Sequence, residues 1–211
     1  MYLSRLTLDP RSREARRDTA SNYELHSTLE RVFHRAPEDQ SRDYLFRRDY
    51  SPRQRVQQVL ILSRTAPDFA VLPQGYSTKV EGPKEFNPAL TPGQQFSFRL
   101  LANPTRKEKR DERKNKPRKP ILERAEQEQW LRRKLAEAGA DLLEVRAETQ
   151  ATLNAHKRGE KAEREKTQTF VPVLFEGALR VTNPAALATA VENGLGSAKG
   201  YGFGLLSLAS A

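Results

Sequence analysis

The order of extended and helical patterns in the second half of the chain most narrows the folds open to it. Hydrophobic alternation predicts strands at 94–102, 142–155, 167–181 and 203–208. Helical periodicity predicts helices at 121–138 and 183–194. The last helix has the clearest ends, because Asn183-Pro184 supplies an N-cap and a first-turn proline and Gly194 a C-terminal stop. This β-α-β-β-α-β order is that of the ferredoxin-like fold.

The first half of the chain follows the same order less regularly. Its expected elements are a strand at 2–8, a helix at 25–33, two strands at 43–50 and 56–64, and an extended stretch up to 83. The Arg-rich segment 11–17 is expected to be a polar connection. We therefore predict an α+β protein of two tandem ferredoxin-like (RRM-like) domains, residues 1–90 and 91–211. The two halves share no sequence identity, so this prediction depends on element order alone.

An excess of positive charge indicates the class of partner. The chain has 37 Lys and Arg against 27 Asp and Glu, which gives a formal net charge of +10. Nine basic and three acidic residues fall within the single run 105–119. Such a charge concentrates polyanions near the protein, so nucleic acid is the first candidate partner. A basic composition that serves only solubility is the alternative.

Composition also excludes several kinds of site. The absence of cysteine excludes disulfides, zinc fingers and thiol catalysis, and three scattered histidines argue against a multi-histidine metal site. The longest apolar runs, 59–62 and 171–175, are far too short to span a membrane. Arg5 and Asp9 stand where a signal peptide needs apolar residues. We expect a cytoplasmic protein with no membrane segment, no metal and no cofactor.

A loop near the C-terminus has five glycines within residues 194–204. It is not a dinucleotide-binding loop, because Lys199 occupies the sixth position and the loop leads from a helix into a strand. It is not a phosphate-binding P-loop, because Lys199 is followed by Gly200. The RNA-recognition-motif signature matches at 199–203 but is broken by Gly204 and Leu206. Two interpretations remain: backbone N–H groups that bind phosphate with help from Lys199, or a tight packing turn.

The first helix carries a candidate catalytic group. His26 lies at the edge of its apolar stripe, with Tyr23 and Glu30 on the same flank. An imidazole can remove the proton from a ribose 2′-hydroxyl or protonate the leaving 5′-oxygen, and nearby cations would stabilise the phosphorane. The cluster predicts RNA cleavage without a metal; a surface histidine beside a tyrosine is the alternative. His34 ends the same helix and His156 joins a basic hairpin, so both are weaker candidates.

Several motifs occur in order along nearly the whole chain. They are Tyr2-Leu3-Ser4-Arg5-Leu6, Arg16-Arg17-Asp18, Asn22-Tyr23-Glu24-Leu25-His26-Ser27-Thr28-Leu29, Pro88-Ala89-Leu90-Thr91-Pro92-Gly93, Phe98-Arg99-Leu100, Ala102-Asn103-Pro104, Val173-Leu174-Phe175-Glu176-Gly177 and Gly204-Leu205-Leu206-Ser207. Two Gly-hydrophobic-Gly triplets, at 194–196 and 202–204, stand five residues apart. Together with the Tyr-x-x-His of 23–26, these motifs resemble the CasE-type CRISPR repeat endoribonucleases of the RAMP superfamily.

The resemblance implies an activity and partners. It implies cleavage of CRISPR precursor RNA at the base of the repeat stem-loop without a metal, leaving a 5′-hydroxyl and a 2′,3′-cyclic phosphate. The enzyme would keep its product and join the Cascade complex, so repeat stem-loop RNA and other Cascade subunits are the expected partners. A non-catalytic ferredoxin-like RNA-binding subunit is the alternative; the presence of both Tyr23 and His26 favours the enzyme.

The resemblance also implies roles for single residues. His26 matches the catalytic histidine and Tyr23 its supporting tyrosine, and the basic hairpin matches the segment that lies beside the RNA stem. Arg31 stands where some relatives have a lysine, although an ideal helix turns it about 140° away from His26. The run 105–119 receives no role beyond a charge that guides RNA approach. The expected RNA contacts are Lys157, Arg158, Lys161, Lys199, Arg31, Arg16, Arg17, Gly194, Gly196, Gly200 and Gly202.

Overall fold

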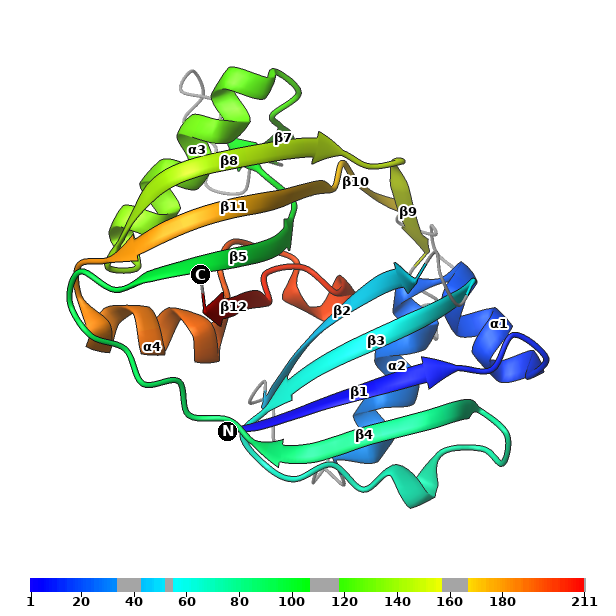
Figure 1. Cartoon of the computed structure of the whole chain (residues 1–211). Helices are drawn as coiled ribbons and strands as arrows, with labels where there is room; N and C mark the ends of the chain where they lie inside the picture. The colour runs from blue at the N-terminus through cyan, green and yellow to red at the C-terminus, as the bar shows by residue number, and fades with distance from the viewer. Residues whose placement is uncertain (34–42, 52–54, 107–117, 157–166, 211) are drawn as a thin grey trace.

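The N-terminal half forms one four-stranded antiparallel sheet with two helices on one face (Figure 1). The computed structural model describes residues 1–33, 43–51, 55–106, 118–156 and 167–210. The elements of this half are β1 (Tyr2–Leu8), α1 (Arg13–Ala20), α2 (Asn22–Val32), β2 (Tyr44–Ser51), β3 (Val56–Ser63), η1 (Phe69–Val71) and β4 (Ser77–Glu85). Their order across the sheet is β2-β3-β1-β4. The first strand therefore lies between the third and fourth, as in the ferredoxin-like fold.

The C-terminal half repeats this arrangement. Its elements are β5 (Gln95–Ala102), β6 (Thr105–Arg106), β7 (Lys119–Pro120), α3 (Arg124–Glu137), β8 (Ala140–Thr149), β9 (Leu153–His156), β10 (Thr167–Phe170), β11 (Val173–Val181), α4 (Pro184–Asn193), η2 (Lys199–Tyr201) and β12 (Leu206–Ser210). The main sheet has the order β12-β5-β11-β8, which again places the first strand between the third and fourth. The predicted tandem ferredoxin-like fold is confirmed, whereas the domain boundary at residue 90 stays a prediction.

The Arg-rich segment after β1 differs from its prediction as a connection, because residues 13–20 form helix α1. Ser12 caps this helix by accepting a hydrogen bond from the backbone N–H of Ala15. Its buried side chains are Ala15 and Asp18, and the Asp18 carboxylate accepts a hydrogen bond from Tyr76 at 2.7 Å. A helix held by one small residue and one buried polar contact lacks the apolar periodicity that sequence analysis detects.

Apolar and polar contacts join the two halves. The N-terminal sheet packs one face on α1 and α2, while Leu45 and Leu62 from its other face belong to the apolar core of the C-terminal half. Arg47, on the same side of β2 as Leu45, is 3% exposed. Its Nη1 donates to the backbone oxygen of Arg99 at 3.2 Å and to Oγ of Ser207 at 2.8 Å. The two sheets are therefore held together by shared core and by one buried guanidinium.

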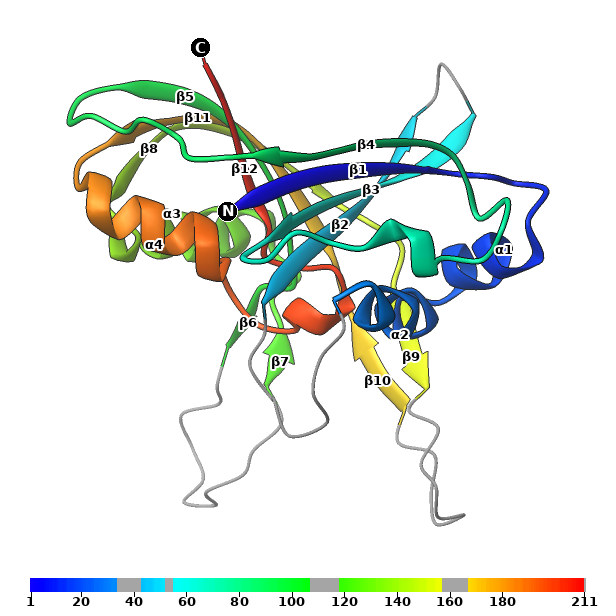
Figure 2. The same cartoon turned by 90° about the horizontal axis from the view of Figure 1, so that it is seen from below.

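The predicted hairpin in the C-terminal half is confirmed as a two-stranded ribbon, β9 and β10, whose last pair is His156 with Thr167. Figure 2 shows this ribbon projecting on the helical side of the sheets, next to α2. Phe170 at its base packs on Tyr201, with ring centroids 4.7 Å apart, and on Phe203 at 5.6 Å. These rings fix the ribbon to the glycine-rich loop.

Candidate active site

Helix α2 presents His26 at the junction of the two halves. Ser21 caps the helix by accepting a hydrogen bond from the N–H of Glu24. Asn22 then donates from Nδ2 to the backbone oxygen of Tyr201 at 2.8 Å, which fixes the start of α2 against η2. The His26 side chain is 28% exposed. The start of α2 is therefore anchored, and the imidazole is partly exposed.

Side chains from α2 and β2 contact the imidazole. Nδ1 of His26 lies 2.7 Å from the hydroxyl of Tyr44, and that hydroxyl donates to Oε1 of Glu30 at 2.9 Å. The same carboxylate oxygen is 3.5 Å from Nε2 of His26. The ring of Phe46 lies nearly parallel to the imidazole, with centroids 6.3 Å apart and planes 10° apart. The predicted proximity of His26 and Glu30 is confirmed, and a tyrosine from strand β2 completes the cluster.

Tyr23 has a different neighbour. Burial, and to a smaller extent the adjacent Tyr23 phenol, raises the pKa of Tyr201 in η2. Tyr44 is a phenol that contacts the imidazole, and helical spacing could not reveal it because Tyr44 comes from a strand. A supporting role for Tyr23 stays a prediction.

The three arginines that were predicted to bind RNA around α1 and α2 have partners within the protein. Arg16 donates to two backbone oxygens in the β1–α1 connection. Arg17 pairs with Asp18 at 2.8 Å and donates to Oγ1 of Thr28, and Arg31 donates to the same oxygen. Thr28 is two residues beyond His26, about 200° around the helix. The structure therefore groups Arg17 and Arg31 away from the imidazole, and their RNA contacts stay predictions.

Close packing accounts for several glycines of the C-terminal loop. Leu195 donates its N–H to the oxygen of Gly204 at 2.8 Å, which closes the loop on itself. A Cβ at Gly194 would lie 2.9 Å from that oxygen, and one at Gly196 would lie 3.3 Å from the ring of Trp130. The packing-turn interpretation therefore fits these two positions, while phosphate binding by Gly194, Gly196, Gly200 and Gly202 stays a prediction.

Gly202 connects this loop with the imidazole. Its φ is +82°, and a Cβ there would lie 3.0 Å from the ring of Phe46, which stacks on His26. The left-handed backbone and the close approach both require glycine. The loop thus sets the position of the ring on which His26 rests.

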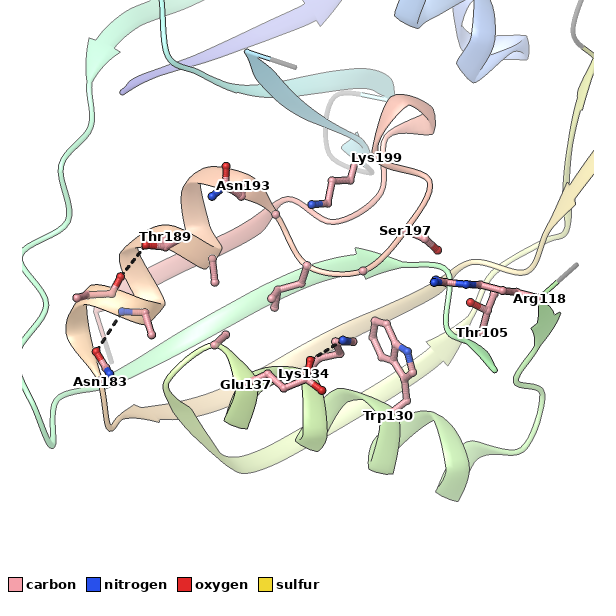
Figure 3. Close-up of a pocket in the computed structure, with 17 residues that line it drawn as sticks. Thr105, Arg118, Trp130, Lys134, Glu137, Asn183, Thr189, Asn193, Ser197 and Lys199 are labelled. Carbon is pink, nitrogen blue, oxygen red and sulfur yellow. Dashed lines mark hydrogen bonds and ion pairs between the residues drawn. The ribbon is translucent and has the colours of Figure 1, made fainter. Parts of the chain in front are cut away.

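A basic pocket lies beside the loop, between α3 and α4 (Figure 3). Its volume is about 690 Å³, and Arg118, Lys134 and Lys199 line it. Lys134 pairs with Glu137 at 2.5 Å. A second pocket of about 560 Å³ shares Arg118 with the first and extends to Phe170 and Tyr201 at the ribbon base. The sequence identified Lys199 as a candidate phosphate contact. It did not identify Lys134, because this lysine lies among the other charged residues of α3.

Part of the predicted site lies outside the described residues. This holds for Lys157, Arg158 and Lys161, which lie between β9 and β10 in the sequence, for His34, and for 107–117 within the basic run. The side chain of His156 is likewise not described, although its backbone pairs in β9.

The described part of the chain has neither a metal-binding cluster nor a membrane-spanning helix. Across 1–33, 43–51, 55–106, 118–156 and 167–210, no group of three or more His, Cys, Asp or Glu side chains is placed to hold a metal ion. In the same part of the chain, no helix combines the length and apolar character needed to cross a membrane. The metal-free chemistry expected from the sequence stays a prediction.

Comparison with known proteins places the chain in a family. Residues 1–210 match the family model described as CRISPR associated protein. The chain belongs to this family. A relative within it, the CRISPR-associated endoribonuclease Cse3 of Thermus thermophilus, is 38% identical over 99% of this chain and 100% of its own length. The CRISPR system Cascade subunit CasE of Escherichia coli is 33% identical over 99% of each chain.

A solved structure shows the same fold in this CRISPR-associated family. CRISPR endoribonuclease Cse3 bound to a 19-nucleotide RNA superposes with a TM-score of 0.87 at 37% identity. The match covers 99% of this chain and 100% of that one. The resemblance stated from sequence motifs is thereby confirmed at the level of family and fold.

Proposed function

We propose that this chain is a CRISPR-associated endoribonuclease that cleaves CRISPR precursor RNA at the base of the repeat stem-loop. The full-length match to Cse3, which is named an endoribonuclease, supports the activity. The RNA-bound Cse3 structure supports the class of substrate. The net charge of +10 agrees with a polyanionic partner.

The observation that carries this proposal is the setting of His26. The imidazole is 28% exposed, contacts a phenol and a carboxylate, and lies on a helix that touches both the glycine-rich loop and the β9–β10 ribbon. A structural histidine in a core would not need access to solvent. An acid–base group that meets an RNA phosphodiester does.

The reaction follows from the acid–base chemistry of an imidazole beside an RNA phosphodiester. A base removes the proton of a ribose 2′-hydroxyl, and O2′ forms a bond to the adjacent phosphorus. The bond from phosphorus to O5′ breaks, and O5′ takes up a proton. One proton is released and one is taken up, so the reaction has no net consumption of protons. The products are a 2′,3′-cyclic phosphate and a 5′-hydroxyl, and no step requires a metal ion.

The two halves have different roles in the proposed reaction. We assign His26 and Tyr23 to an N-terminal domain, residues 1–90, and the RNA-holding elements to a C-terminal domain, residues 91–211. Lys157 and Arg158 at the ribbon tip lie beside the RNA stem, and Lys199 contacts phosphate from the glycine-rich loop. The basic pocket beside Lys199 extends this surface.

The enzyme keeps its product and joins a Cascade complex in the cytoplasm. The match to the Escherichia coli Cascade subunit CasE over 99% of both chains supports this assembly. A subunit that retains its guide RNA needs affinity that outlasts cleavage, so RNA contacts other than that of His26 hold the product.

Cleavage of the cognate repeat RNA with and without EDTA tests this function. We expect equal rates in both conditions, and we expect His26→Ala to bind the RNA with unchanged affinity but not to cut it. Ser27→Ala, an exposed neighbour on α2, is the matched control and should cut normally. Loss of cleavage in EDTA would contradict metal-free chemistry. Wild-type protein that binds without cutting in both conditions would favour the non-catalytic RNA-binding subunit.

A further inference from the structure

Arg48 is a partly buried arginine on strand β2 to which the proposed reaction assigns no role. The pairing of β2 with β3 is continuous from Tyr44 to Ser51, so the side chains alternate regularly and Arg48 lies on the same side of β2 as Tyr44 and Phe46. The Tyr44 hydroxyl is 2.7 Å from Nδ1 of His26, and the Phe46 ring stacks on the imidazole. Arg48 is therefore the next side chain along the strand that supports the imidazole, with its Cα about 7 Å beyond that of Phe46.

Elements from both halves surround the Arg48 side chain. It lines a small cavity of about 30 Å³ together with Asn22 and Tyr201, and with Leu153 and Phe170 at the base of the ribbon. It also lines a larger pocket of about 370 Å³ between β2 and the C-terminal sheet. Arg48 is thus placed where α2, the glycine-rich loop and the ribbon meet.

The charge of Arg48 has no counter-ion in the part of the chain that the structure describes. The guanidinium donates to the backbone oxygen of Thr19 near the end of α1, and no described carboxylate lies within 4 Å of it. A neutral carbonyl uses one of the five N–H donors and offsets little of the charge. Burial lowers the pKa of Arg48, as expected for a cation removed from water without an anion beside it. Buried charges in proteins ordinarily have a partner, because an isolated one costs free energy.

The carboxylates that line the larger pocket with Arg48 are Asp49 and Glu148, and both have other positive partners. Asp49 lies on the opposite side of β2, where it pairs with Arg47 at 3.0 Å and lies 3.9 Å from Nε of Arg99. Glu148 is 3.6 Å from an exposed arginine of its own strand. The guanidinium of Arg48 therefore remains for a ligand.

We propose that Arg48 binds a phosphate of the RNA close to the scissile bond. This inference rests on the proposed function and adds a contact that holds the substrate, not an acid–base group. A guanidinium presents N–H donors in a planar fork that matches the oxygens of a phosphate, and the phosphate charge supplies the counter-ion. An acidic segment of a neighbouring protein offers similar charge. The place of Arg48, one side chain beyond the ring on which His26 rests, favours RNA, because the substrate must reach the imidazole.

The substitution Arg48→Met tests the proposal, because it keeps an apolar stem and removes the charge. For repeat RNA with a 2′-deoxynucleotide upstream of the scissile phosphate, we expect the dissociation constant to rise about tenfold. The salt slope of binding should fall by about one unit. Arg48→Lys keeps the charge but not the fork, so it should restore the slope and only part of the affinity. Arg180→Met is the matched control, since Arg180 pairs with Asp141 at 2.9 Å at the end of β11 away from the ribbon; its affinity should stay within about twofold of wild type.

Methylphosphonate substitution of single phosphates near the cut identifies the contact. At the phosphate that Arg48 binds, the neutral group should weaken wild-type binding about as much as Arg48→Met does. It should not weaken binding by Arg48→Met further, whereas at other phosphates the two losses should add. Arg48→Lys supplies the same comparison if Arg48→Met does not fold.

An unchanged dissociation constant and salt slope for Arg48→Met, or losses that add at every phosphate, would overturn the proposal. Unchanged RNA binding with a lower melting temperature would make Arg48 a cap for the end of α1, and unchanged binding with normal melting would leave an acidic protein surface as the ligand. Wild-type protein that binds RNA through Arg48 but does not cut the unmodified repeat would refute the endoribonuclease function and leave the phosphate contact in place.

Discussion

The buried guanidinium of Arg47 gives a prediction about how the two halves stay together. Arg47→Met keeps the apolar stem and removes the charged head, which is 4% exposed. The head donates to Asp49 at 3.0 Å and to three acceptors in the C-terminal half, the backbone oxygens of Arg99 and Leu205 and Oγ of Ser207. All of these contacts are lost at once in the variant.

The expected loss of stability follows from how deeply Arg47 and Asp49, the two partners of the ion pair, are buried. Removing one partner of a buried ion pair costs about 3–5 kcal/mol, because the other charge is left unpaired. The carboxylate of Asp49 is 20% exposed and also lies 3.9 Å from Nε of Arg99, so water and this second guanidinium compensate part of the loss, and we expect about 3 kcal/mol. For a chain of this length, that corresponds to a melting temperature lower by about 6–12 °C.

Thermal and urea unfolding of the two proteins provide the measurement. Arg146→Met is the control, since Arg146 is 78% exposed, lies 3.6 Å from Glu148, and should change stability by less than about 0.5 kcal/mol. Arg47→Lys keeps the charge but not the planar fork, so it should recover only part of the loss. A loss below about 1 kcal/mol for Arg47→Met would refute the argument that this guanidinium joins the halves.

Two further predictions concern the loop and the ribbon. Gly202→Ala should cost about 1–2 kcal/mol for its left-handed backbone and slow cleavage, because the added Cβ would lie 3.0 Å from Phe46, which supports the catalytic imidazole. Gly93→Ala has the same strain with nothing within 4 Å, so it should lose similar stability and cut normally; equal cleavage by both variants would contradict the coupling. Combined Lys157→Ala and Arg158→Ala should weaken stem binding and flatten its salt dependence by about one to two units of slope, and an unchanged slope would remove the ribbon tip from the RNA interface.

Local chemistry made parts of the fold predictable. Helix α4 begins and ends where the sequence indicates, because Asn183 accepts a hydrogen bond from the N–H of Ala186 and Gly194 adopts a φ of +74°. Both signals lie within a few residues of the helix ends. The buried side of α3 is harder to predict, because it includes the polar Gln127 together with Trp130, whereas Ala125 is exposed.

The candidate site also contains local contacts, which the sequence predicts, and long-range contacts, which it does not. His26 and Glu30 share a helix, and their spacing of four residues predicted their contact. Tyr44 approaches from strand β2, and its contact depends on how the sheet packs against α2, which no spacing within one element reveals. A supporting role for Tyr23, which shares the helix with His26, stays a prediction. The approach of Gly202 to Phe46 is also a long-range contact and was not predicted.

The central claim is that RNA is cut by its own 2′-hydroxyl with His26 as the acid–base group. Substituting a 2′-deoxynucleotide immediately upstream of the scissile phosphate tests it most directly, with the unmodified repeat RNA as the control. The account predicts that the modified RNA binds with normal affinity and is not cleaved, in the presence or absence of EDTA. Cleavage of the deoxy-substituted RNA at the same bond would contradict internal attack and the role assigned to His26.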